Sequence, residues 1–144
     1  MSHLNNLVDL SPILLETLAK SPKTLLYFYP KDNTPGCTLE AQDFTRLKND
    51  FAKLGIQIIG VSKDNELSHE TFINSCNLAI ELISDDGSLH EQFGVIGEKR
   101  NYGKVYIGVI RSTFLLDSSG KLVKEWRNVK ATGHAAKILK ELQI

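Results

Sequence analysis

The sequence predicts an α/β fold in which helices cover both faces of a central mixed β-sheet. Short apolar runs rich in β-branched and aromatic residues alternate with amphipathic segments in the first half of the chain, as in β-α-β units. Two later apolar runs are joined by the turn sequence of residues 117–120, which favours an antiparallel hairpin. A last amphipathic segment follows the hairpin. Parallel units followed by a hairpin give a mixed sheet.

One domain over residues 1–144 is expected, because no repeat, linker or low-complexity stretch divides the chain. Ser11 as N-cap and Pro12 at the first helical position predict a helix over residues 11–20. The apolar run 24–29, ended by Pro30, predicts a buried strand. Further helices are expected at 37–54, 66–77, 88–93 and 132–142, and further strands at 56–61, 80–83, 109–116 and 121–127. This order suits a thioredoxin-like fold, although a fold alone does not give a function.

The composition excludes several classes of protein. Lysine plus arginine and aspartate plus glutamate are 17 each, so the formal charge gives no reason to expect nucleic acid or an anionic membrane as partner. No apolar run approaches the roughly 20 residues of a membrane span, and the first ten residues lack the pattern of a secretory signal. A cytoplasmic protein is therefore expected. Its two cysteines are too few for a disulfide framework, and its four scattered histidines have no metal-ligand spacing.

The segment from Pro30 to Cys37 carries the clearest chemical signal. A buried strand leads into a loop of turn-forming residues, and the loop places Cys37 in the first turn of the predicted 37–54 helix. Unpaired N–H groups and the positive end of the helix dipole favour a thiolate there. Gly36 permits close backbone approach, and Thr34 can direct its hydroxyl at whatever the sulfur attacks. The alternative is a cysteine that is simply packed in the core, which is the common fate of a free thiol.

Arg111 starts the predicted strand 109–116, whose later residues are apolar. A buried strand seldom tolerates an unpaired guanidinium, so an anionic partner is expected. The alternative is an ordinary surface ion pair. The sequence alone does not bring Arg111 to Cys37.

Pro30, Thr34 and Cys37 match the P-x-x-x-T-x-x-C signature of peroxiredoxins, and Arg111 with the following STFLLD resembles the catalytic arginine strand of that family. The wording YFYPKDNTPGCTLEAQDF, with YGKVYIGVIRSTFLLD later, resembles the bacterioferritin-comigratory-protein (Q-type) subgroup over residues 24–142. The resemblance implies a cofactor-free peroxidase that reduces hydrogen peroxide and organic hydroperoxides through a sulfenic acid on Cys37. Thr34 and Arg111 would hold the peroxide, and Pro30 would shield the pocket. Glu40 resembles a residue that braces the site, although a solvated surface carboxylate is an equal alternative.

The resemblance leaves open which thiol reduces the sulfenic acid on Cys37. Many Q-type members carry a resolving cysteine five residues after the first, a position that is Gln42 here. Cys76 lies one turn beyond the place from which some related proteins resolve, so it is a possible resolving thiol. It also shares an apolar stripe with Phe72, so plain packing is the alternative. The family's usual N-terminal motif and hairpin are not visible before Leu25.

The resemblance implies thioredoxin or a similar thiol reductant as partner, and a monomer or weak homodimer. Two other classes remain as alternatives. A thiol–disulfide oxidoreductase on the same fold is disfavoured, because Cys37 lacks the second cysteine of a Cys-x-x-Cys motif. A redox-silent binding module is the third class, and it predicts that Cys37→Ser changes nothing functional.

Overall fold

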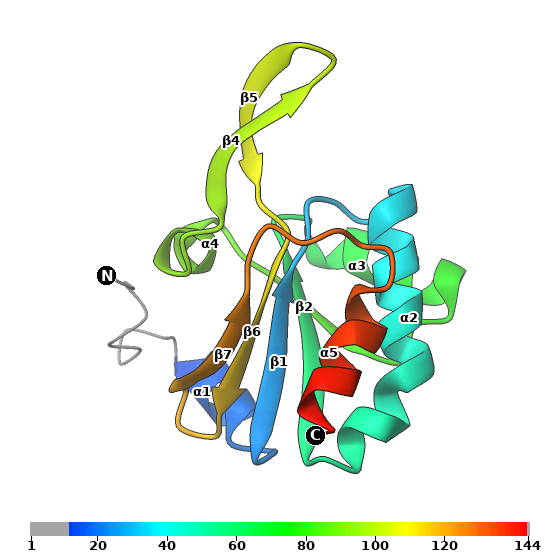
Figure 1. Cartoon of the computed structure of the whole chain (residues 1–144), viewed down its shortest axis with the longest axis vertical. Helices are drawn as coiled ribbons and strands as arrows, with labels where there is room; N and C mark the ends of the chain where they lie inside the picture. The colour runs from blue at the N-terminus through cyan, green and yellow to red at the C-terminus, as the bar shows by residue number, and fades with distance from the viewer. Residues whose placement is uncertain (1–11, 144) are drawn as a thin grey trace.

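The computed structural model describes residues 12–143, which form a five-stranded mixed sheet with helices on both faces and a two-stranded hairpin (Figure 1). The predicted α/β, thioredoxin-like fold is confirmed, while the predicted N-cap Ser11 lies outside the described residues. The elements in chain order are α1 (Pro12–Leu18), β1 (Lys23–Phe28), α2 (Pro35–Ala52), β2 (Ile56–Ser62), α3 (Glu66–Cys76), β3 (Glu81–Ser84), α4 (Ser88–Gln92), β4 (Ile96–Asn101), β5 (Lys104–Val109), β6 (Ser112–Asp117), β7 (Leu122–Trp126) and α5 (His134–Leu142).

The strand order β3-β2-β1-β6-β7 puts β1 in the middle of the sheet. β1, β2 and β3 are parallel, and α2 and α3 form the crossovers that parallel neighbours need. β6 runs antiparallel to β1 with Ser112 opposite Phe28. This register brings the residue before Ser112, which is Arg111, beside the chain that leaves β1 toward the loop of Cys37.

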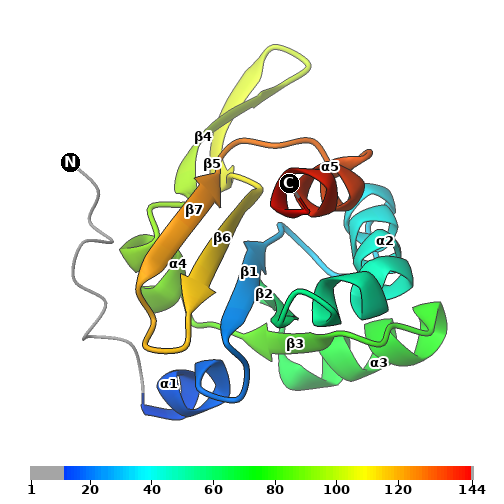
Figure 2. The same ribbon diagram turned by 60° about the horizontal axis from the view of Figure 1, so that its bottom comes forward.

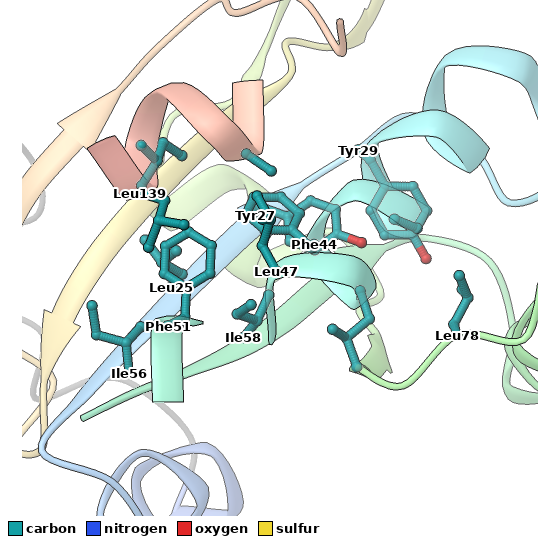
Figure 3. Close-up of a cluster of buried hydrophobic side chains, with 14 of the residues drawn as sticks. Leu25, Tyr27, Tyr29, Phe44, Leu47, Phe51, Ile56, Ile58, Leu78 and Leu139 are labelled. Atoms are coloured by element: carbon teal, nitrogen blue, oxygen red, sulfur yellow. The ribbon is translucent and has the colours of Figure 1, made fainter. Parts of the chain in front are cut away.

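Both faces of β1 are buried from Thr24 onward, which is why residues 25–28 are apolar. Leu25 and Tyr27 lie on the face covered by α2 and α5, and the close-up shows them packed with Phe44 and other side chains of this cluster (Figure 3). Leu26 and Phe28 point to the opposite face, where they share a second cluster with residues of α1 and the segment after α4. Figure 2 shows the two groups of helices on either side of the sheet. The centre of the sheet is therefore fixed from both sides.

The region 97–109 departs from the prediction. The charged run 98–100 favours a solvated loop, and the next predicted strand starts at residue 109, but β4 and β5 form a hairpin that projects from the body (Figure 1). Tyr102 and Gly103 at its tip both have positive φ, 53° and 77°, as a two-residue hairpin turn requires. β5 ends at Val109 and β6 begins at Ser112, so Arg111 lies between two strands rather than inside one.

Helix α2 begins at Pro35, two residues before the predicted start, because proline is well suited to the first helical position. Its buried face also differs from the apolar stripe that helical spacing alone predicts, which is Leu39, Phe44, Leu47, Phe51 and Leu54. Leu39 and Leu54 are exposed. The buried positions are instead Cys37, Glu40, Ala41, Phe44, Leu47 and Phe51. The helix therefore turns Cys37 and Glu40 inward, toward the sheet.

No helix within residues 12–143 combines the length and the apolar character that crossing a membrane requires.

Candidate active site

Cys37 lies in the first turn of α2 and is 1% exposed. The extended backbone of Thr34, followed by Pro35, starts the helix, and the N–H of Thr38 closes the first turn on the carbonyl of Thr34. The backbone N–H groups of Gly36 and Cys37 are among those at a helix start that have no hydrogen-bond partner inside the helix. The sulfur is therefore sheltered from solvent and lies close to the positive end of the helix dipole.

Arg111 reaches Cys37 and Glu40 with one guanidinium group. Its Nη2 lies 3.3 Å from Cys37 Sγ, and its Nη1 donates to Glu40 Oε1. The Arg111 side chain is 14% exposed and that of Glu40 is fully buried. The surface-carboxylate alternative for Glu40 and the surface-pair alternative for Arg111 are therefore wrong. The structure brings three predicted site residues together from two distant segments of the chain.

The charges in this cluster affect one another. Burial raises the pKa of Glu40 from 4.5 to about 7, and the positive charge of Arg111 opposes that rise. Burial works to lower the pKa of Arg111, but the charges of Glu40 and Cys37 outweigh it and raise that pKa. The guanidinium therefore stays charged beside the sulfur. A positive charge at this distance stabilises a thiolate and any negative charge that develops next to it.

Backbone contacts fix where Arg111 sits. The carbonyl of Arg111 accepts a hydrogen bond of 2.9 Å from the N–H of Val129, and the N–H of Ile110 donates to the carbonyl of Val95. A Cβ added at Gly36 would lie 3.4 Å from Arg111 Nη2 and 3.7 Å from Ala131 Cβ. The guanidinium therefore lies next to Gly36, at a distance that is ordinary van der Waals contact for an added Cβ.

Thr34 and Pro30 belong to the loop before α2. Both side chains are partly exposed. The Thr34 hydroxyl donates to the carbonyl of Lys31 at 2.9 Å. Because its proton is used there, the oxygen of Thr34 is left with lone pairs that can accept a hydrogen bond.

Cys76 is the last residue of α3 and is half-buried, with its sulfur 4.0 Å from Asn33 Oδ1. Asn33 belongs to the loop that leads to Cys37, so the structure brings Cys76 to this loop. Both cysteines are free thiols. Cys76 also packs against the cluster that contains Phe72, as the packing alternative expects.

Sequence reasoning missed a polar cluster beside the loop. His69 of α3 is 4% exposed and bonded to Asp32. Tyr29 and Ser68 donate to the same carboxylate. The only local signals were a turn-type aspartate and a histidine near a helix start, which are common in solvated positions as well.

A cavity of about 650 Å³ lies at the opposite end of the strands, where Gly55 and Ile56 line it. Cys37 does not line this cavity. The reactive thiol and its charged neighbours therefore lie away from this cavity.

A buried cysteine at a helix start beside a partly buried arginine, on a sheet of this order, is the arrangement of a thiol-based redox enzyme with a thioredoxin-like fold. Comparison with known proteins agrees. Residues 5–125 match the model of the AhpC/TSA family. A putative peroxiredoxin bcp of Helicobacter pylori J99 is 49% identical over 121 residues, covering 83% of this chain and 80% of the relative. Peroxiredoxin Bcp of Bacillus subtilis is 48% identical over 125 residues, covering 86% and 80%.

A solved structure of the Xanthomonas campestris bacterioferritin comigratory protein, described for its alkyl peroxide reduction activity, superposes with a TM-score of 0.77. It is 47% identical, over 84% of this chain and 78% of that one. The chain belongs to the AhpC/TSA family, and within it to the peroxiredoxins, which are thiol-dependent peroxidases. The resemblance to the bacterioferritin-comigratory-protein (Q-type) subgroup is confirmed.

Proposed function

We propose that Cys37 is the nucleophile of this peroxidase and that Arg111, Thr34 and Glu40 serve it. The observation that carries the proposal is the guanidinium of Arg111, which contacts the Cys37 sulfur and the buried Glu40 carboxylate together. The Cys37 thiolate attacks the terminal oxygen of a hydroperoxide and the O–O bond breaks. An alkoxide or hydroxide leaves and is protonated to alcohol or water, while Cys37 becomes a sulfenic acid.

Each neighbour has a distinct part in this step. Arg111 stabilises the thiolate and the negative charge on the leaving oxygen. The oxygen of Thr34 accepts the hydrogen bond of the hydroperoxide O–H, which aligns the O–O bond with the sulfur. Glu40 holds the guanidinium in place through its other nitrogen, Gly36 leaves room for it, and Pro30 shields the thiol from bulk water.

Cys76 is proposed as the resolving thiol. Its half-buried sulfur lies against Asn33, in the loop that leads to Cys37. The Cys76 thiolate would attack the sulfenic sulfur of Cys37, forming a disulfide and releasing water, and both segments must open locally for the sulfurs to meet. Thioredoxin or a similar dithiol in the reducing cytoplasm would then restore both thiols. The alternative is a one-cysteine enzyme that is reduced directly by an external thiol.

The test is the intact mass of the reduced protein after one equivalent of hydrogen peroxide, with the remaining thiols then alkylated. Loss of both thiols without added oxygen and without dimer formation supports Cys76 as the resolving thiol. Added oxygen at Cys37 with Cys76 still alkylated identifies a one-cysteine enzyme. If both thiols survive, or if Cys37→Ser consumes peroxide as the wild type does, the proposed nucleophile is wrong.

A further inference from the structure

A buried contact ties the loop before Cys37 to helix α3. Asp32 of the loop and His69 of α3 are 6% and 4% exposed. Oδ2 of Asp32 lies 2.7 Å from Nδ1 of His69, although 37 residues separate the two in the chain. None of the steps proposed above uses either side chain. A contact this well buried, only two residues before Thr34 in the chain, calls for its own explanation.

Both ring nitrogens of His69 face groups that accept hydrogen bonds. Nδ1 faces the Asp32 carboxylate and Nε2 lies 3.0 Å from the carbonyl oxygen of Ile83. A carboxylate and a carbonyl do not donate, so the two contacts are both satisfied only when the ring carries two protons. The contact is therefore an imidazolium–carboxylate pair.

The carboxylate of Asp32 has the further bonds that a buried ion pair needs. Tyr29 donates its hydroxyl to Oδ1 at 2.6 Å, and Ser68 donates to Oδ2 at 2.8 Å. The backbone N–H of Asp32 donates to Oδ2 of Asp64 at 2.8 Å. A buried pair is favourable only when its remaining lone pairs are satisfied in this way, and breaking it leaves an uncompensated charge. The loop is therefore held at Asp32 from three directions.

We propose that the His69–Asp32 ion pair is a latch that positions the loop of residues 30–36, and through it Thr34 and Cys37, for attack on the hydroperoxide. This inference rests on the proposed function. His69 and Asp32 are positioning residues, since they act through the loop and not on the substrate. A displacement of about 1 Å of a reacting group can cost a hundredfold in rate, so a loose loop is enough to slow the reaction.

The protein contains a matched control for this latch. His90 and Asp85 form a second buried pair, with Nδ1 2.7 Å from Oδ2 and His90 fully buried. His90 packs against Phe28, whose side chain belongs to the hydrophobic cluster on the other face of the sheet. Breaking this pair removes a similar contact without touching the loop of Cys37.

The experiment compares full-length His69→Gln and His90→Gln at a temperature at which both are folded by circular dichroism. Two rates are measured for Cys37 in each: thiol loss with hydrogen peroxide, and alkylation by iodoacetamide followed by peptide mass. We expect His69→Gln to lower the peroxide rate by about tenfold or more and to raise the alkylation rate, because the loop opens and exposes the sulfur. His90→Gln should leave both rates within about twofold of the wild type.

Ser68→Ala is the milder variant should His69→Gln fail to fold, since it removes one hydrogen bond to Asp32, and it should shift both rates in the same directions to a smaller extent. Nitrogen-15 spectra of the wild type should show both His69 ring nitrogens protonated at neutral pH. Equal slowing in the His69 and His90 variants, or a bare ring nitrogen on His69, would overturn the latch. If Cys37 of the wild type does not react with peroxide, the proposed function is wrong. The nitrogen-15 spectrum still tests the His69–Asp32 ion pair in that case.

Discussion

Nη2 of Arg111 lies 3.3 Å from Sγ of Cys37, although 74 residues separate them in the chain. The contact arises because β6 pairs with β1 in a register that sets Ser112 opposite Phe28. β1 ends and β6 begins at the same edge of the sheet, so the residue before β6 faces the loop after β1. The charge that the thiol chemistry needs is thus delivered by strand pairing.

Replacing Arg111 by lysine should slow the oxidation of Cys37 by about a hundredfold, the usual cost of removing one well-placed donor from a site of developing charge. Lysine keeps the positive charge but has no planar fork to reach Cys37 and Glu40 together. The measurement is the second-order rate of Cys37 thiol loss with hydrogen peroxide. A rate within about twofold of the wild type would show that charge alone is sufficient and that the two-sided contact is not used.

Glu40→Gln should change the pH dependence of the same rate. The pKa of Glu40 is raised to about 7 by burial, so in the wild type the carboxylate that orients Arg111 forms as the pH rises through about 7. We expect a limb of the wild-type pH profile with this midpoint, and its absence in Glu40→Gln. If the two profiles superpose after scaling, the ionisation of Glu40 does not control the site.

The same carboxylate should affect stability in the opposite direction. Its pKa in the folded protein, about 7, is above its ordinary value of 4.5, so the stabilising contribution is present below pH 4.5 and is lost as the pH rises through about 7. Urea unfolding at several pH values measures this. The free energy of unfolding of the wild type, relative to that of Glu40→Gln, should decrease as the pH rises from 4.5 to about 7.

Thr34→Val should lower the peroxide rate by about tenfold, because valine keeps the shape of threonine but accepts no hydrogen bond from the hydroperoxide. Thr34→Ser is the matched control and should stay near the wild-type rate. The measurement is the rate constant for oxidation of Cys37 by hydrogen peroxide in the wild type and in both variants. Equal loss in the valine and serine variants would contradict the assigned role, because serine keeps the hydroxyl that accepts the hydrogen bond.

His134 should make the protein sensitive to acid. Burial, aided by the charge of Arg111, lowers the pKa of His134 from 6.5 to about 4, and its Nε2 lies 2.8 Å from the hydroxyl of Thr113. The stability from the neutral ring is therefore present above pH 6.5 and is lost as the pH falls through about 4. In His134→Gln the unfolding free energy should lose this acid dependence. An NMR titration of the His134 ring with a midpoint near 6.5 would contradict the assignment.

Local signals in the sequence were enough for most elements of the fold. β1 was predicted from a short apolar run ended by Pro30, and the start of α2 from a turn that contains Pro35 and Gly36. The hairpin of β4 and β5 was not predicted, because β4 is largely polar and the apolar residues of β5 do not alternate with polar ones. Several of its apolar side chains, Val105 and Ile107 among them, are exposed, so burial left no pattern there.

The sequence by itself determined that a cysteine opens a helix after a buried strand, since the turn residues, the proline and the apolar run are all local. Only the tertiary structure decided what surrounds that cysteine. The pairing of β6 with β1 supplies Arg111, the rotation of α2 buries Glu40, and the packing of α3 brings His69 to Asp32. These contacts join side chains 37 to 74 residues apart, and their choice depends on which faces the whole core buries.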